Sequence, residues 1–174
     1  EKGYSLNNQS VSDDFVSGSS KPVSYLGKVA SLLYERYLYG QKPIAMVSTD
    51  NCSHNGDKLY EAMNAFATNW AKNNKVEKGF VDYVNDKSKV SFPWSMIDKI
   101  TPRPDKHVKE MLSGIEGIDG LVTSKNTYIA PFVNSEESEY LVIEDWFPNG
   151  RPNLEKAGVL FTDRETVDKV EKMK

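Results

Sequence analysis

The sequence predicts an α/β fold, in which helices alternate with strands around a layered sheet. Three observations carry this prediction. A β-branched and apolar run at residues 44–47 ends abruptly in short polar side chains. A helical stripe of apolar residues follows it at residues 59–70. Strand-like runs recur at residues 140–144 and 158–162, with dense turn residues between them. The chain of 174 residues has the length of one ordinary domain.

The first quarter of the chain is expected to contain a loop, a helix and a strand. Residues 5–21 are polar and rich in Ser, Asn and Gly, which predicts a loop. From Pro22 onward, apolar residues recur at three- and four-residue steps, and this periodicity predicts a helix that ends near Gly40. Residues 43–48 follow as a predicted buried strand. The apolar stripe of the helix comprises Leu26, Val29, Ala30, Leu33 and Tyr37.

Two further helices are predicted before residue 85. Asn55 or Asp57 can cap the first of them. Its apolar residues follow one another at steps of four, three and four, and we interpret this stripe as core packing, not as a cofactor box. The stripe comprises Leu59, Met63, Phe66 and Trp70. Residues 76–84 form the second predicted helix.

The middle of the chain is expected to be less regular. Residues 91–104 contain three prolines, which predicts an extended, turning segment. A short helix over residues 105–112 is expected to begin at an Asp105 cap and to end at Gly114.

The last part of the chain is predicted to alternate strands with one helix. Residues 147–152 are dense in turn residues. Asp163 or Thr166 is expected to cap a terminal helix whose pattern runs to Lys174. The predicted strands are residues 127–133, 140–144 and 158–162.

Composition excludes several classes of function. The net charge is −3 and no basic stripe is visible, which argues against a nucleic-acid partner. No apolar run is long enough to span a bilayer, and no signal peptide is visible, so no membrane partner is expected. The single cysteine, Cys52, cannot form an intrachain disulfide and suits a reducing, cytoplasmic compartment. No CxxC or HxxxH spacing is present, so no metal is expected.

Both ends of the chain, together with one missing motif, predict a fragment of a longer protein. The chain starts at Glu1 without Met and stops inside a helical pattern at Lys174. No two glycines are spaced two apart, so the G-x-G-x-x-G dinucleotide fingerprint is absent. The residues alone therefore do not show nucleotide binding, and we expect the chain by itself to be inactive.

Asp50 and Asn51 are the first candidate site residues. They follow the predicted strand at its carboxyl end, where ligands bind in open α/β sheets. In the functional interpretation they line a site where cofactor and substrate meet, and the Asn51 amide donates to a substrate oxygen that develops negative charge. In the structural interpretation they only form a turn and a helix entry, which is the commoner role of such a pair.

Further candidates lie in the last third of the chain. Arg151 ends a turn that follows two acids, so it either pins the loop through a carboxylate or holds an anionic group. Glu171 and Lys174 are three residues apart and share one helix face. A surface ion pair is the default for them, whereas a buried lysine could act as a general base toward an alcohol. His54 and His107 are lone histidines for which we expect a structural or surface role.

Several segments, in this order, resemble the polyol-specific long-chain dehydrogenase family, which includes mannitol dehydrogenases and fructuronate reductases. Each segment is weak alone, but their order across nearly the whole chain is specific. They are residues 1–4 (Glu-Lys-Gly-Tyr), 48–51 (Ser-Thr-Asp-Asn) with 55–56 (Asn-Gly), 92–93 (Phe-Pro) with 95–102, 143–145 (Ile-Glu-Asp) with 147–148 and 150–152, 155–158 (Glu-Lys-Ala-Gly) and 171–174 (Glu-Lys-Met-Lys).

The resemblance implies a fold and a set of roles. Residues 1–164 would be the second part of a Rossmann-like nucleotide-binding domain whose first βαβ unit is missing, and residues 165–174 would begin a helical substrate domain. Lys174 would be the general base and Asn51 the donor to the reacting oxygen. Asp98 would lie close to the site, and Glu171 would gate proton exchange. Asp50 and Asn51 would contact the cofactor, NAD.

The resemblance also implies the reaction. The parent protein would transfer hydride between NAD(H) and C5 or C2 of an acyclic sugar acid or polyol, without a metal. Conversion of fructuronate to D-mannonate is the preferred expectation, and interconversion of mannitol and fructose is the alternative. A different class also stays open, since the chain by itself could be a non-catalytic α/β module.

Overall fold

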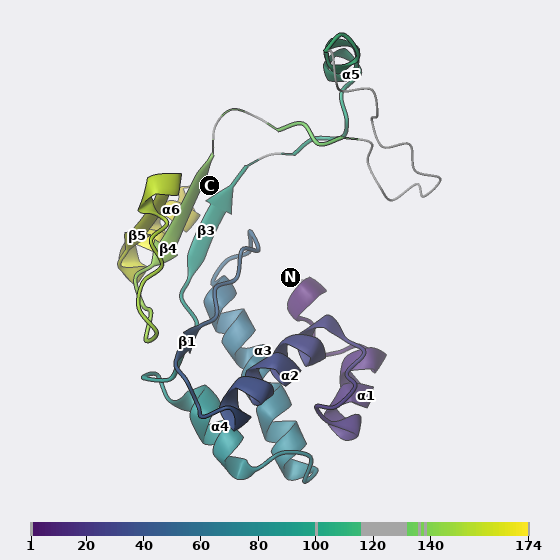
Figure 1. The fold of residues 1–174 in the computed structure, drawn as a ribbon, viewed down its shortest axis with the longest axis vertical. Helices are drawn as coiled ribbons and strands as arrows, with labels where there is room; N and C mark the ends of the chain where they lie inside the picture. The colour runs from purple at the N-terminus through teal and green to yellow at the C-terminus, as the bar shows by residue number, and fades with distance from the viewer. Residues whose placement is uncertain (1, 100, 116–131, 136, 138, 174) are drawn as a thin grey trace. The chain divides into compact units, whose positions relative to one another are not determined.

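The computed structural model describes residues 2–99, 101–115, 132–135, 137 and 139–173. The chain divides into two compact units (Figure 1). The first combines Glu1–Ile97 with Leu141–Lys174, and the second is Asp98–Tyr140. Among the described residues, the first unit holds nearly all of the secondary structure and all of the buried core.

A layer of four helices forms most of the first unit. After a short 3-10 turn at Lys2–Tyr4 come α1 (Gln9–Ser17), α2 (Tyr25–Leu38), α3 (Asn55–Lys72) and α4 (Lys78–Asn85), which pack against one another (Figure 1). The predicted stripes of α2 and α3 are confirmed as core: most of their residues are fully buried, and the others pack against them. The fully buried members are Ala30, Leu33, Met63, Phe66 and Trp70.

The predicted loop at residues 5–21 is wrong, because α1 occupies its middle. Asn8 caps this helix by accepting from the Val11 amide at 2.9 Å. The polar composition hid a buried carboxylate: Asp14 is 1% exposed and accepts from the amides of Val23 and Ser24 at 2.9 and 2.8 Å. A helix with so many polar residues is stabilised by these tertiary contacts, which no local pattern reveals.

The predicted strand at residues 43–48 is real but much shorter and only half-buried. It is β1 (Ile44–Ala45), which pairs in parallel with β2 (Val90–Ser91). The register joins Ile44 to Val90 and Ala45 to Ser91. The Ala45 amide donates to the side-chain oxygen of Asn149 at 3.0 Å, so this side chain occupies a hydrogen-bonding position on β1.

A second sheet has the order β3-β4-β5. Its strands are β3 (Ser95–Asp98), β4 (Tyr140–Glu144) and β5 (Val159–Thr162), and β4 and β5 are parallel, with Leu141 opposite Val159. The predicted strands at 140–144 and 158–162 are thus confirmed. Residues 127–131 of the third predicted strand lie outside the described residues, and residues 132–133 are not in a strand.

Two of the predicted helix starts are confirmed, and one is wrong. Asp105 caps α5 (Lys106–Ser113), and Asp163 caps α6 (Arg164–Lys172), as predicted. Neither Asn55 nor Asp57 caps α3: the N-cap is His54, in a left-handed conformation with φ 53°. Asn55 is instead free to turn inward, which decides the geometry of the candidate site.

Candidate active site

The site is built on the segment between β1 and α3. Ser48 in this segment is buried. Its hydroxyl pairs with the Tyr4 hydroxyl and accepts from the Asp50 amide at 3.1 Å, and these bonds turn the segment back. Burial, partly offset by the Ser48 bond, raises the pKa of Tyr4, so this phenol stays neutral and available as a partner. The segment therefore has a defined path between strand and helix.

Asn55 fastens this segment to β3. Its side chain is fully buried, and its amide nitrogen donates to the Asp50 carbonyl at 2.8 Å and to the Ser95 carbonyl at 2.9 Å. Its amide oxygen accepts from the Ser95 amide at 3.0 Å. The Ser95 hydroxyl also bonds to the Ser48 carbonyl. The Asn55 side chain thereby makes the hydrogen bonds to β3 that a neighbouring strand would otherwise make.

Gly56 completes the junction because no larger residue fits there. A Cβ at this position would lie 2.4 Å from the Phe92 carbonyl oxygen and 2.8 Å from the Pro93 carbonyl oxygen. Both are backbone atoms that cannot rotate away. The Asn55-Gly56 pair thus has two physical requirements, a buried amide and a close backbone approach.

Asp50 and Asn51 lie exposed in this segment, after the carboxyl end of β1. The Asn55 bond to the Asp50 carbonyl holds the backbone at this point. Next to them, Cys52 is partly buried, and this burial together with the Asp50 charge raises the pKa of its thiol. The geometry allows Asp50 and Asn51 to meet a ligand from outside. Neither residue is the N-cap of α3, which is His54.

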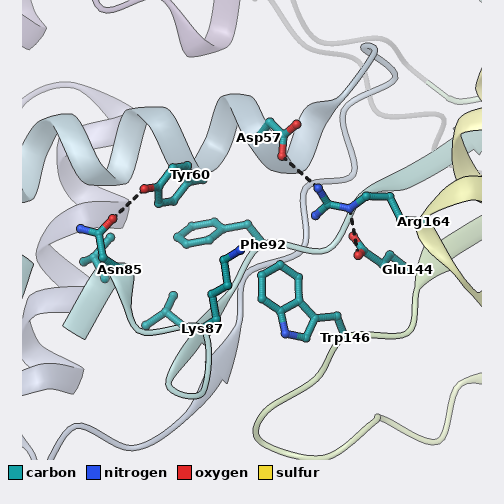
Figure 2. Close-up of a pocket in the computed structure, with 10 residues that line it drawn as sticks. Asp57, Tyr60, Asn85, Lys87, Phe92, Glu144, Trp146 and Arg164 are labelled. Carbon is teal, nitrogen blue, oxygen red and sulfur yellow. Dashed lines mark hydrogen bonds and ion pairs between the residues drawn. The ribbon is translucent and has the colours of Figure 1, made fainter. Parts of the chain in front are cut away.

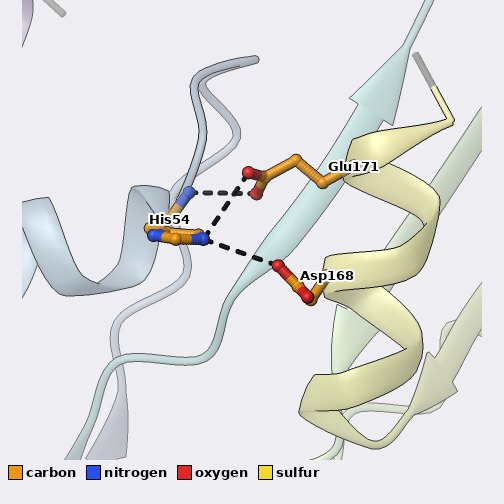
Figure 3. Close-up of side chains that lie close together, drawn as sticks. All are labelled: His54, Asp168 and Glu171. Carbon is orange, nitrogen blue, oxygen red and sulfur yellow. Dashed lines mark hydrogen bonds and ion pairs between the residues drawn. The ribbon is translucent and has the colours of Figure 1, made fainter.

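Glu171 on α6 reaches the same segment through His54 (Figure 3). The His54 amide donates to one Glu171 oxygen at 3.0 Å, and the imidazole Nε2 lies 3.7 Å from the other. The same Nε2 lies 3.6 Å from Asp168. Lys172 bonds Asp168 at 2.5 Å and holds the pKa of that carboxyl below its usual range, with His54 adding to the effect. The structure thus brings the segment between β1 and α3 that carries Asn51 (the Asn51 segment) close to the C-terminal end of α6.

The His54 ring is part of a stack of aromatic and cationic side chains. It lies parallel to the Trp94 indole, with centroids 4.2 Å apart and planes at 18°. The Arg164 guanidinium lies 4.6 Å from the Trp94 ring. Arg164 also bonds Glu144 at 3.0 Å and lies 3.6 Å from Asp57. Sequence reasoning did not single out Arg164 and expected a structural or surface role for His54, because the partners of both residues lie 20 to more than 100 residues away in the chain.

Arg164 forms one wall of a pocket of about 470 Å³ (Figure 2). The opposite wall comes from the first turns of α3 and the end of α4, and Phe92 and Trp146 line it between them. Its lining holds two carboxylates, Asp57 and Glu144, which both pair with Arg164, and one further cation, Lys87. None of the predicted site residues that the structure describes lines this pocket.

Arg151 is engaged within its own loop. It bonds Asp145 at 2.8 Å and Glu155 at 3.2 Å, and its guanidinium lies 5.3 Å from the Phe161 ring. The first of the two sequence interpretations, a loop pinned by an arginine–carboxylate pair, is therefore the one that the geometry bears out.

Asp98 and Lys174 are the two remaining predicted site residues. Asp98 belongs to the second unit, at the end of β3, where its charge adds to the burial that raises the pKa of Tyr140. In that unit Lys99 pairs with Glu139 at 2.5 Å. Lys174 lies outside the described residues, two positions after the last residue of α6.

The described residues hold one grouping whose side chains are close enough to share a metal ion. The donor atoms of His54, Asp168 and Glu171 lie within 4.8 Å of one another. No sequence spacing predicted it, since His54 is more than 100 residues from its partners. For a dinucleotide the described residues fit only in part: they offer the exposed Asp50 and Asn51 after a parallel strand, but the chain carries no glycine fingerprint. Among the described helices, none has the length and apolarity to cross a membrane.

Fold and site together define a Rossmann-like nucleotide-domain segment with a polar loop at its ligand edge. Residues 11–156 match the model of the mannitol dehydrogenase Rossmann domain. The chain belongs to the mannitol dehydrogenase family, which confirms the predicted family and fold class.

Relatives agree with this assignment. The chain is 52% identical, over its whole length, to 34% of the D-mannonate oxidoreductase of Thermotoga maritima. It is 31% identical over 94% of its length to 30% of a polyol:NADP oxidoreductase of Gluconobacter oxydans. A mannitol 2-dehydrogenase of Cereibacter sphaeroides is 32% identical over 82% of this chain and 26% of its own. The chain thus spans about a third of the length of the curated relatives that it matches.

Solved structures support the same fold. The mannitol 2-dehydrogenase of Pseudomonas fluorescens, in ternary complex with NAD and D-mannitol, superposes with a TM-score of 0.72 at 30% identity, over 97% of this chain and 30% of that one. A substrate-free D-sorbitol dehydrogenase superposes with a TM-score of 0.73 at 27% identity, over 95% of this chain and 32% of that one.

Proposed function

We propose that the protein containing this chain is an NAD-dependent oxidoreductase that interconverts fructuronate and D-mannonate. The observation that carries the proposal is the 52% identity to a D-mannonate oxidoreductase along the entire chain, against 31–32% to the polyol and mannitol enzymes over less of it. The substrate partner would be a small sugar acid, and the cytoplasm would be the compartment.

The proposed roles follow the geometry of the Asn51 segment. Bound NAD would supply the hydride acceptor, with Asp50 and Asn51 contacting it. Lys174 would take the alcohol proton as hydride leaves the substrate carbon, and the Asn51 amide would donate to the same oxygen. Glu171 would control proton exchange with water. The bond from the His54 amide to Glu171 supports a shared site, because it ties the Asn51 segment to the helix that precedes Lys174.

We also propose the domain boundary at residue 164. Residues 1–164 would belong to the Rossmann-like domain, and residues 165–174, the body of α6, would begin a helical substrate domain. Asp98, at the end of β3, would complete the site once both domains are present.

The experiment is an assay of the full-length protein that contains this chain, with NADH against fructuronate, tagaturonate and fructose. Turnover of fructuronate with the highest kcat/KM supports the proposal. A preference for fructose would replace it with the alternative, a mannitol 2-dehydrogenase, which the superposition on the NAD and D-mannitol complex favours. Failure to turn over any of the three would refute both.

A second assay addresses the 174-residue chain by itself. We propose that it does not bind NADH tightly, because the glycine fingerprint that holds the pyrophosphate is absent from the sequence. Titration of NADH fluorescence with this chain measures that affinity. Tight binding would contradict the proposal and would show that the described loop is sufficient for the cofactor.

A further inference from the structure

His54 makes two separate contacts to one carboxylate. Its amide donates to Glu171 Oε2 at 3.0 Å, and its imidazole Nε2 lies 3.7 Å from Glu171 Oε1 (Figure 3). The Glu171 side chain is 8% exposed, whereas the His54 side chain is 49% exposed. A carboxylate so well covered needs partners for both oxygens, and His54 lies against both.

The backbone conformation of His54 places both its amide and its imidazole beside Glu171. His54 has φ 53° and ψ 42°, a left-handed conformation that His and Asn adopt more readily than most residues. This conformation turns the amide toward α6 and lays the ring on Trp94, 4.2 Å away between centroids. The stack on Trp94 limits rotation of the imidazole, so the ring stays beside the two carboxylates.

We propose that His54 is a positioning residue for Glu171. It holds the Glu171 carboxylate, and with it the last turn of α6 before Lys174, against the segment that carries Asn51. The proposal rests on the function proposed above, since it assigns to His54 the relative placement of the proton-exchange residue and the oxygen donor. His54 itself contacts neither substrate nor cofactor in this role.

Charged groups from two sides surround His54. Asp168 and Glu171 face the imidazole from α6, and Lys172 bonds the far side of Asp168. Asp57 and Arg164 lie beyond Trp94, the first bonded to its indole nitrogen and the second over its ring. The imidazole therefore lies between the two carboxylates of α6 and the Trp94 ring, and these neighbours keep it beside Glu171.

The test is a steady-state comparison in the full-length protein. His54→Asn keeps the left-handed backbone and the amide donor but removes the imidazole. We expect kcat to fall about tenfold, the scale of a displaced catalytic geometry, while KM for NADH changes less than twofold. His107→Asn, at an exposed position on α5, is the matched control and should match the wild type.

Glu171→Gln and the double variant complete the cycle. If His54 acts through Glu171, the double variant loses no more activity than Glu171→Gln does. Additive losses, or a wild-type kcat in His54→Asn, would overturn the positioning role.

Hydrogen exchange tests the contact without any activity. In the full-length protein, mass spectrometry of a peptide spanning residues 52–56 reports exchange of the His54 amide. Glu171→Ala removes its acceptor, and we expect exchange to be about tenfold faster. Unchanged exchange would refute the contact even if the enzyme is active. Faster exchange in a protein without turnover would uphold the contact and place the failure in the proposed function.

Discussion

Asn55 and Ser95 are joined by paired hydrogen bonds of the kind that link neighbouring strands. The Asn55 amide oxygen accepts from the Ser95 amide at 3.0 Å, and the Asn55 amide nitrogen donates to the Ser95 carbonyl at 2.9 Å. Both residues are almost fully buried, at 0% and 1% exposed. Because one side chain supplies both bonds, the Asn51 segment is anchored to β3 without any strand pairing there.

Replacing Asn55 is therefore expected to be costly. Asn55→Ala leaves the buried Ser95 amide and carbonyl without partners, and we expect the free energy of unfolding to fall by about 3 kcal/mol. Urea denaturation followed by circular dichroism measures the loss. Asn7→Ala, at an exposed position, serves as the control and should lie within about 0.5 kcal/mol of wild type. Equal stability of the two variants would show that the pair contributes nothing.

Asp14 gives a second stability prediction, which tests the unexpected helix α1. Its carboxylate accepts from two amides and from the Ser24 hydroxyl at 2.5 Å, all in buried surroundings. Asp14→Ala is expected to lower the free energy of unfolding by about 3 kcal/mol, through the unsatisfied donors. Its neighbour Asp13, which is exposed and accepts from the Gln9 side chain, is the matched control. A loss as small as that of Asp13→Ala would contradict the arrangement.

Tyr34 predicts a pH dependence at the alkaline end. Burial, with the Glu77 carboxylate that accepts its hydroxyl at 2.5 Å, raises the pKa of Tyr34 to about 12. The folded-state pKa exceeds the unfolded value of 10.0, so the contribution to stability is complete below pH 10 and is lost as the pH rises toward 12.

The stability advantage of wild type over Tyr34→Phe should accordingly shrink between pH 10 and pH 12. Chemical denaturation at several pH values measures it. Tyr39→Phe, whose ring is 78% exposed, should show no such trend. An advantage that stays constant across this range would refute the assigned role of Tyr34.

Cys52 is predicted to be a slow thiol. Its pKa is raised, first by burial and then by the Asp50 charge, so less thiolate is present at pH 8 than in free cysteine. Alkylation by iodoacetamide should be slower than that of free cysteine, and Asp50→Asn should accelerate it about two- to threefold. Because the chain has a single cysteine, mass spectrometry reads the reaction directly. No acceleration in Asp50→Asn would remove the electrostatic part of the explanation.

Lys174 is predicted to dominate turnover in the full-length protein. Lys174→Ala should lower kcat by roughly 10²-fold or more, the scale of losing a general base. Lys169→Ala is a suitable control, since Lys169 forms only an exposed ion pair with Glu165 on α6. Initial rates with fructuronate and NADH decide the matter, and a drop smaller than about threefold would remove Lys174 from this role.

The sequence by itself determined the features that one element carries alone. The apolar periodicity located α2 and α3, and Asp105 and Asp163 marked the starts of α5 and α6. The strand at 140–144 was placed residue for residue. These signals are local, because burial of one helix face and the need of a first turn for a side-chain acceptor leave their mark within a few residues.

Only the tertiary structure decided the pairings. It made the polar segment around Asp14 a helix, shortened β1 to two residues, and turned Asn55 inward toward Ser95, 40 residues away. It also joined His54 to Glu171, 117 residues along the chain. The physical reason is that a polar residue in a sequence does not reveal whether its side chain is solvated or hydrogen-bonded in the interior. Its partner, and with it its function, is chosen by packing between distant elements.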